Sequence, residues 1–235
     1  MERGGLKLAR FGSAGEAAVA LAGELARSLD DALAARGQAS LAVPGGRTPV
    51  PLFEALRKAA LDWRRVTVTL TDERWVAPSH PGSNEAMVRG ALLQDRATVA
   101  RWAPLYDGSA DAAQAAAGVS QRLQQQVLPF DAVVLGMGED GHFASLFPGN
   151  AGLREALDTR AAPGCVAMQA PVQPKQRLSL NLAALAATRR LFLLVSGHPK
   201  RRLLEEAGQD PAGDRWPIGA VLALAEPLVE IYWSP

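Results

Sequence analysis

Short apolar runs and segments of helical spacing alternate along the chain. The apolar runs predict β-strands at residues 40–43, 66–71, 130–135, 166–170, 178–180, 191–195 and 229–233. Apolar positions that recur every three or four residues predict helices at 14–35, 49–60, 83–93 (with Ser83 as the cap), 110–127, 151–157, 182–187, 200–207 and 218–225. This alternation predicts an α/β fold in which helices cover both faces of a mostly parallel sheet.

Length and composition fit one domain. The chain has 235 residues, of which 48% are hydrophobic, and this is enough for a sizeable core. No repeat, linker or low-complexity segment divides it, so we expect a single domain over residues 1–235. The 25 basic and 24 acidic residues leave a net charge of +1, and neither sign forms a long run. This balance disfavours binding of nucleic acid or of a membrane surface, but leaves open a small anionic ligand.

Cysteine and histidine usage narrows the chemistry further. Cys165 is the only cysteine, and its apolar surroundings predict a buried thiol rather than a nucleophile. His80, His142 and His198 lie too far apart for metal-ligand spacing, so we expect no metal. Charges interrupt the apolar part of residues 1–29, unlike in a signal peptide, and no apolar run reaches membrane-spanning length. The expectation is a cytoplasmic protein.

The most informative segment is residues 136–142, GMGEDGH, which follows the predicted strand 130–135. Its three glycines let the backbone adopt positive φ angles and approach a ligand closely. Ligands of open parallel sheets bind at the carboxyl ends of the strands. We therefore expect an active-site loop here, with His142 as its reactive side chain.

The spacing Gly136-x-Gly138-x-x-Gly141 also matches a dinucleotide-binding fingerprint. That fingerprint needs a helix opening at the last glycine and an acidic residue at the end of the next strand, about 20 residues later. Here Pro148-Gly149 interrupts the segment, and the nearest acidic residues lie in the helix-like stretch 151–157. This context disfavours a dinucleotide site.

A second loop, residues 44–49 (PGGRTP), leads from a strand into a helix. Free N–H groups of Gly45 and Gly46, the positive helix end and the Thr48 hydroxyl suit a phosphate group. The loop lacks the Lys-Ser/Thr ending of a nucleotide P-loop, which disfavours a triphosphate. The alternative is an ordinary strand–helix turn that Thr48 caps.

Charged residues also follow other strands. Asp72 and Arg74 come at the end of the strand 66–71 and are candidates to orient a polyhydroxylated ligand or a water molecule, beside Trp75. The alternative is a solvated ion cluster. Arg177 and Lys200 lie in two basic loops, and both side chains suit a clamp on an anion bound at the glycine loop.

Together these segments resemble the 6-phosphogluconolactonase family. The resemblance rests on PGGRTP at 44–49, TDER at 71–74 with Ser83-Asn84, GMGEDGHFASLFP at 136–148, and RLSL at 177–180 before Ser196-Gly197 and Lys200. It covers most of the chain, in the family's order. It implies a Rossmann-like, three-layer α/β fold shared with sugar-phosphate deaminases and isomerases. It further implies hydrolysis of 6-phospho-D-glucono-1,5-lactone in the oxidative pentose phosphate pathway, with no metal or organic cofactor. We expect a monomer or a weak homodimer.

The competing possibility is a deaminase or isomerase of the same superfamily. In the deaminases, the residue before the proline of the histidine loop is a glutamate that assists ring opening, and here it is Phe147. Because an apolar ring cannot relay a proton, this difference favours the lactonase. Ser179, where threonine is common, is a mild departure from the lactonase pattern. A sugar-phosphate sensor without catalysis and an NAD(P)-linked oxidoreductase are further alternatives.

Lactone hydrolysis needs a general base, a group that stabilises the oxyanion, and a tether for the substrate. His142 is the candidate base, and either Asp140 or Asp72 is expected to hold its tautomer. Arg74 or backbone N–H groups of residues 136–141 are candidates for the oxyanion. The expected phosphate tether consists of Gly45, Gly46, Thr48, Arg177 and Lys200.

Overall fold

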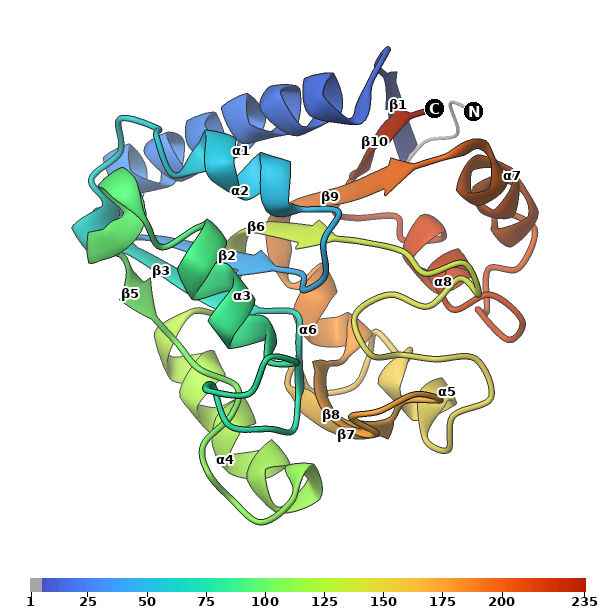
Figure 1. Cartoon of the computed structure of the whole chain (residues 1–235). Coiled ribbons are helices and arrows are strands. Elements are labelled where there is room, and N and C mark those ends of the chain that lie inside the picture. The colour runs from blue at the N-terminus through green and yellow to red at the C-terminus, as the bar shows by residue number, and fades with distance from the viewer. Residues whose placement is uncertain (1–5) are drawn as a thin grey trace.

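The computed structural model describes residues 6–235 and contains a seven-stranded central sheet (Figure 1). The first five residues, part of the N-terminal stretch considered above for a signal peptide, lie outside the described residues. In spatial order the strands are β1 (Leu6–Arg10), β10 (Val229–Ser234), β9 (Thr188–Ser196), β6 (Phe130–Leu135), β2 (Ala39–Val43), β3 (Val66–Leu70) and β5 (Arg101–Trp102). All neighbouring strands run parallel, which confirms the predicted fold class.

The two central strands, β6 and β2, are buried along their whole length. A strand that is covered on both faces reads as a continuous apolar run rather than an alternating one, and Val133, Val134 and Leu135 follow this rule. The edge strand β1, which the sequence analysis missed, is only partly buried. Its mixture of apolar and basic residues is the reason that no apolar run marked it.

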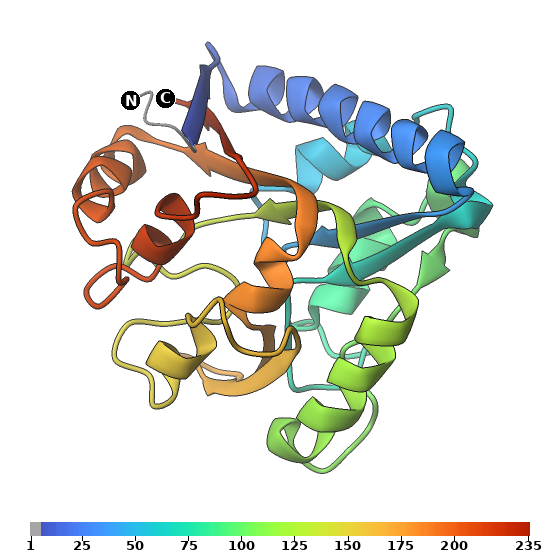
Figure 2. The same ribbon diagram turned by 180° about the vertical axis from the view of Figure 1, so that it is seen from behind.

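Helices lie on both sides of this sheet (Figures 1 and 2). The pictures place α1 (Ala14–Arg36) and α2 (Val50–Leu56) on one side, and α4 (Ala112–Gln126) and α6 (Leu182–Ala186) on the other. The remaining helices are α3 (Asn84–Ala91), α5 (Leu153–Ala156), α7 (His198–Ala207) and α8 (Ile218–Leu222), with short 3-10 turns at Trp63–Arg65 and Asp95–Val99. Among residues 6–235, no helix combines the length and apolarity needed to span a membrane.

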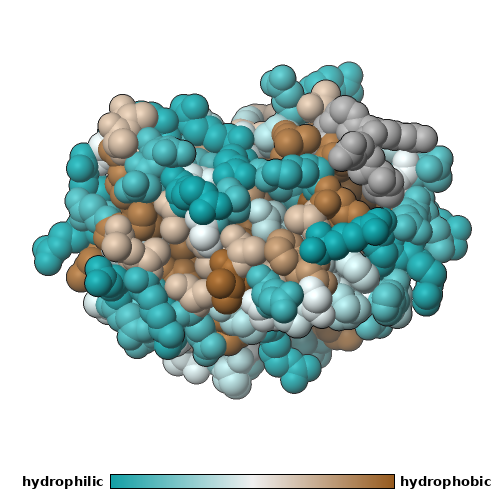
Figure 3. All heavy atoms as spheres, turned by 90° about the horizontal axis from the view of Figure 1, so that it is seen from above, coloured by the Kyte–Doolittle hydropathy of each residue, from teal (hydrophilic) through white to brown (hydrophobic). Residues whose placement is uncertain are grey.

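The long helix α1 shows why the sequence pattern predicts this arrangement. Its buried positions recur every three or four residues and form one stripe that packs on the sheet. Ser13 caps the first turn by accepting a hydrogen bond from the Glu16 N–H, and Gly37, with φ of 74°, ends the helix. Seen from the side of α1, most of the surface is hydrophilic, with hydrophobic residues in a central band (Figure 3).

Two predicted helices are shorter than expected. The segment 49–60 is helical only as α2, because hydrogen bonds between residues three apart, such as Ala59 N–H to Leu56 C=O at 2.9 Å, replace the α-helical pattern after its end. The segment 151–157 contains only the single turn α5. The Ser83 cap on α3 is confirmed, since its side chain accepts a hydrogen bond from the Ala86 N–H.

The placement of two predicted strands in the main sheet was wrong. Strands β7 (Cys165–Gln169) and β8 (Gln176–Leu180) instead form a separate antiparallel sheet with β4 (Asp72–Arg74). The physical reason lies in the connection 170–175, which is too short for the crossover that two parallel strands require. This small sheet extends from the carboxyl end of β3 and lies on the same side as α4 and α6 (Figure 1).

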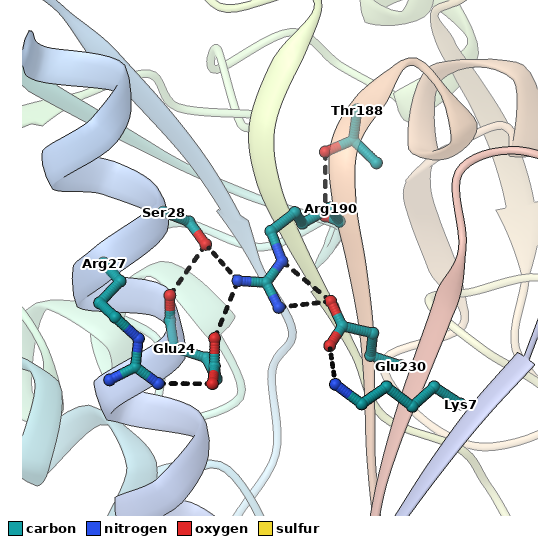
Figure 4. Close-up of polar contacts among 7 residues, drawn as sticks. All are labelled: Lys7, Glu24, Arg27, Ser28, Thr188, Arg190 and Glu230. Atoms are coloured by element: carbon teal, nitrogen blue, oxygen red, sulfur yellow. Dashed lines mark hydrogen bonds and ion pairs between the residues drawn. The ribbon is translucent and has the colours of Figure 1, made fainter.

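A charged network ties α1 to the sheet at the amino ends of β9 and β10 (Figure 4). Arg190 donates hydrogen bonds to Glu230 at 2.5 and 2.8 Å, to Glu24 at 2.9 Å and to Ser28 at 3.1 Å. Lys7 of β1 adds an ion pair to Glu230 at 3.7 Å. Because the Glu230 side chain is only 8% exposed, its charge depends on these partners.

The order of the strands also determines where a ligand binds. Strands β2 and β6 are neighbours, but the chain continues from β2 to β3 on one side and from β6 to β9 on the other. The loops after these two strands therefore diverge and leave a crevice between them, which is the usual ligand site of open α/β sheets.

Candidate active site

A cavity of about 310 Å³ lies at this crevice. It brings together residues from the loops after β2 and β6, from the small sheet and from the start of α3. The lining residues are Pro44, Gly45, Gly46, Thr48, Pro49, Asp72, Arg74, Asn84, Gly136, Met137, Gly138, His142, Ala144, Phe147, Val172 and Arg177. Most of the residues predicted from separate sequence segments thus surround one space.

The histidine loop, residues 136–142, folds back on itself through a backbone hydrogen bond. The Gly138 N–H donates to the His142 C=O at 2.9 Å, and a Cβ atom at Gly138 would lie 2.2 Å from the His142 ring. Only glycine therefore fits at position 138, because any side chain there would collide with the His142 ring. Of the three glycines expected to adopt positive φ, only Gly141 does so, at 75°, and the expectation was wrong for Gly136 and Gly138.

The structure pairs His142 with Asp140. The imidazole Nδ1 lies 2.5 Å from Asp140 Oδ1, and the same oxygen accepts the His142 backbone N–H at 3.2 Å. A carboxylate on Nδ1 favours the tautomer that carries its proton there, which leaves Nε2 free to accept a proton. The Phe147 ring packs against the imidazole with 4.4 Å between the ring centres. The histidine thus has one polar partner and one apolar wall.

Asp72 has a different partner. Its Oδ2 accepts a hydrogen bond from the Ser145 hydroxyl at 2.6 Å, and its side chain is buried in the cavity wall. The Ser145 N–H in turn donates to the Ser179 hydroxyl at 3.2 Å. Of the two carboxylates proposed to orient the imidazole, Asp140 is therefore the one in contact with it. Asp72 lines the cavity, with Ser145 as a hydrogen-bond donor.

Two arginines meet on the small sheet. Arg74 of β4 is directly opposite Arg177 of β8, so both side chains lie on one face of the antiparallel pair. The Arg177 side chain is buried, and this burial lowers the pKa of its guanidinium, as does the charge of Arg74, while Asp72 raises it. Arg74 donates to the Gly82 C=O at 2.7 Å, whereas its buried Nε has no partner within the described residues. The pair concentrates positive charge at the cavity.

The glycine loop borders the same cavity. Gly46 has φ of 87°, which favours glycine, and a Cβ atom at Gly45 would lie 2.0 Å from the Asn84 side-chain oxygen. The alternative that Thr48 caps the following helix was wrong, because Pro49 occupies the N-cap position of α2 and no side chain caps that helix. The exposed Thr48 side chain lines the cavity instead.

Lys200 does not line the cavity. It lies in α7 rather than in a loop, and its Nζ donates to the Met137 C=O at 2.6 Å. Arg177, also expected in a loop, lies in β8. The structure therefore brings Arg177 to the cavity with Arg74, whereas Lys200 contacts the back of the histidine loop.

Sequence reasoning assigned no role to Asn84, Glu73 and Ser145. Asn84 lines the cavity, Glu73 is fully buried beneath Arg74, and Ser145 holds Asp72. The Ser83 cap was a usable signal for the position of Asn84 at the start of a helix. Only the structure shows that Asn84 contacts Glu73 and Asp72. No comparable signal marks Ser145, whose partner lies 73 positions away in the sequence.

Comparisons with known proteins identify the family of this chain. The family described as glucosamine-6-phosphate isomerases/6-phosphogluconolactonase matches residues 12–233. A 6-phosphogluconolactonase of Pseudomonas aeruginosa is 45% identical over 231 residues, which cover 98% of this chain and 96% of the relative. One of Rhizobium meliloti is 43% identical and covers 93% of this chain and 94% of its own.

Solved structures give the same result. A crystal structure of a 6-phosphogluconolactonase from Shewanella baltica has a TM-score of 0.93 and 38% identity, with 98% of each chain covered. A monomeric glucosamine-6-phosphate deaminase has a TM-score of 0.78 at 16% identity, which shows a shared fold alone. The chain therefore belongs to the glucosamine-6-phosphate isomerase/6-phosphogluconolactonase family.

Proposed function

We propose that this protein is a lactonase that hydrolyses 6-phospho-D-glucono-1,5-lactone to 6-phospho-D-gluconate. The curated relatives at 40–45% identity that cover nearly the whole chain are 6-phosphogluconolactonases, and they support this activity. The observation that carries the proposal is that His142, which is paired with Asp140, lines one cavity with Arg74 and Arg177. The pair suits activation of water, and the arginines suit a phosphate group.

In the proposed mechanism, His142 Nε2 takes a proton from a water molecule as the water oxygen attacks the lactone carbonyl carbon. Asp140 on Nδ1 stabilises the imidazolium that forms. The tetrahedral intermediate then collapses, the bond between the carbonyl carbon and the ring oxygen breaks, and the imidazolium returns its proton to that oxygen. The products are a carboxylic acid, which ionises, and a free hydroxyl group.

Arg74 and Arg177 are proposed to bind the substrate phosphate together with Gly45, Gly46 and Thr48. Two guanidinium groups on opposite register positions of one sheet face repel one another, and an anion between them removes that repulsion. This assignment leaves the backbone N–H groups of residues 136–141 as the groups that stabilise the oxyanion.

The remaining polar residues have supporting roles in this proposal. Asp72, which Ser145 holds in the wall, is suited to accept hydrogen bonds from sugar hydroxyl groups. Lys200 is proposed to fix the histidine loop through the Met137 C=O rather than to bind phosphate. The mechanism uses no metal ion or organic cofactor.

The proposal is tested by following the loss of the phosphorylated lactone, generated in situ by oxidation of glucose 6-phosphate. The protein should accelerate this loss well above the spontaneous rate. Ammonia release from glucosamine 6-phosphate would instead indicate a deaminase, and tight binding without turnover would indicate a sensor. The apolar Phe147 beside His142 argues against the deaminase, because it offers no group for proton transfer.

A further inference from the structure

Glu73 is a fully buried carboxylate that the proposed mechanism does not use. It lies in β4 between Asp72 and Arg74, so its side chain points away from the cavity face of the strand. Both of its oxygens are saturated with donors. Oε1 accepts the N–H groups of Arg74 and Asn84 at 2.7 Å each, and Oε2 accepts the Glu85 N–H at 2.7 Å and the Ser83 hydroxyl at 3.0 Å.

These four donors suit a carboxylate and no other side chain. An ionised carboxylate is an acceptor only, and three of its partners are backbone N–H groups, two of them in the first turn of α3. The positive end of that helix stabilises the negative charge. Burial raises the pKa of Glu73, while the four hydrogen bonds oppose that shift. An amide in its place would turn an N–H group toward N–H donors.

The same contacts connect Glu73 to two parts of the cavity wall. On one side, Glu73 holds the backbone of Arg74, whose guanidinium reaches back to the Gly82 C=O just before α3. On the other side, it holds the backbone of Asn84, whose side-chain amide donates to the Asp72 C=O at 2.8 Å. Glu73 thus joins strand β4 to the start of α3.

Asn84 extends this connection to the glycine loop. Its amide group lies so close to Gly45 that a Cβ atom there would be 2.0–2.4 Å from the amide atoms. A shift of the first turn of α3 would therefore release or displace the loop at residues 44–49. Arg74 and this loop are two of the groups assigned above to the phosphate. Glu73 contacts the first through the Arg74 N–H and the second through Asn84.

We propose that Glu73 is a positioning residue that holds Arg74 and, through Asn84, the Gly45–Gly46 loop in the arrangement that binds the substrate phosphate. The inference rests on the proposed function, since it assigns the phosphate to these groups. It does not involve the His142–Asp140 pair, because Glu73 makes no hydrogen bond to either residue within the described chain. Glu73 therefore acts on substrate binding and not on the chemical step.

The test compares Glu73→Gln with Asp131→Asn. Asp131 is a comparable buried carboxylate, 6% exposed, which accepts the Ser40 N–H at 2.9 Å and pairs with Arg36. It lies at the amino end of β6, whereas the cavity lies at the carboxyl ends of the strands. For Glu73→Gln we expect KM for the phosphorylated lactone to rise about 10-fold or more, the loss of about 1.4 kcal/mol, with kcat changed less than about threefold. Hydrolysis of unphosphorylated gluconolactone should be unchanged. Asp131→Asn should lower Tm without changing KM.

A second measurement does not depend on lactonase activity. Inorganic phosphate should raise the Tm of the wild-type protein and of Asp131→Asn, and this increase should be smaller in Glu73→Gln. If Glu73→Gln does not fold, Glu73→Asp, which keeps the charge but withdraws it by one methylene group, serves in both measurements with the same expected direction.

The outcomes distinguish a failure of the positioning role of Glu73 from a failure of the proposed lactonase function. A fall in kcat at unchanged KM, or an equal loss on both lactones, would show that Glu73 does not act through the phosphate site, while the function would stand. A wild-type protein that leaves the lactone at its spontaneous rate would refute the function instead. Equal stabilisation of wild type and Glu73→Gln by phosphate would overturn the positioning role in either case.

Discussion

Replacing Arg177 with Met gives the most direct test of the proposed phosphate site. The substitution keeps an unbranched apolar side chain in the buried position and removes the guanidinium that faces Arg74 across the β4–β8 pair. A charge-assisted hydrogen bond contributes about 1.5–3 kcal/mol, so kcat/KM for the phosphorylated lactone should fall by roughly 10- to 150-fold. Most of this loss should appear as a higher KM, because the phosphate lies away from the reacting bond.

The stability of the free protein provides an internal check on the same variant. Burial and the neighbouring Arg74 lower the pKa of Arg177, which means that the folded protein stabilises its charge less than water does. Removal of that charge offsets the loss of the hydrogen bond from Arg177 Nε to the Pro174 C=O, at 2.9 Å. We therefore expect Tm without ligand to stay within about 3 °C of wild type, a change of roughly 1 kcal/mol or less.

The assay follows both the phosphorylated lactone, generated in situ, and unphosphorylated gluconolactone, each against its spontaneous hydrolysis. The variant should lose activity only on the phosphorylated substrate, since gluconolactone offers nothing for the arginine to bind. An equal loss on both substrates at unchanged Tm would mean that Arg177 takes part in the chemical step. The assignment of the phosphate to the arginine pair would then have to be abandoned.

Four further outcomes are expected. His142→Asn should lower kcat by about 10²–10⁴-fold at nearly constant KM, and normal turnover by a folded variant would remove it from the mechanism. Lys200→Met should raise KM less than Arg177→Met does, because the Lys200 Nζ donates to the Met137 C=O and is not assigned to the phosphate. Steady-state kinetics of both variants measure this difference. Activity should survive exhaustive EDTA treatment, since an imidazole activates the water, and a loss that only a divalent ion restores would contradict this. Burial raises the pKa of Glu24, but hydrogen bonds from Arg190 and Arg27 outweigh it and hold that pKa below 4.5, so the ionised form adds stability above this pH that is lost as the pH falls. Tm measured from about pH 5 to pH 3 should therefore fall less steeply in Glu24→Gln than in wild type.

Much of the fold was predictable from local patterns. Buried parallel strands need continuous apolar runs, and surface helices need an apolar stripe, so segments such as 130–135 and 14–35 could be assigned from their own residues. The short connection 170–175 also contained enough information to exclude a parallel pair, although the prediction did not use it. The positions of the loops at the strand ends were predictable from the alternation of strands and helices.

Most members of the site were predictable, but their pairings were not. The sequence by itself determined that the glycine loop, the TDER segment and the histidine loop meet at the carboxyl ends of the strands, because parallel strands place those ends together. Arg177 was also expected there, but the antiparallel β4–β8 pair, and not a parallel strand, brings it to the cavity. The resemblance to the lactonase family rested on the same segments, and the family match agrees with it.

Only the tertiary structure decided which side chains are partners. Asp140 rather than Asp72 contacts His142, Arg74 lies opposite Arg177, and Lys200 binds the back of a loop. Such choices depend on the register of strands about 100 residues apart and on distances of a few tenths of an ångström. Local propensity does not encode either quantity, since each arises only when the packed core brings distant segments together.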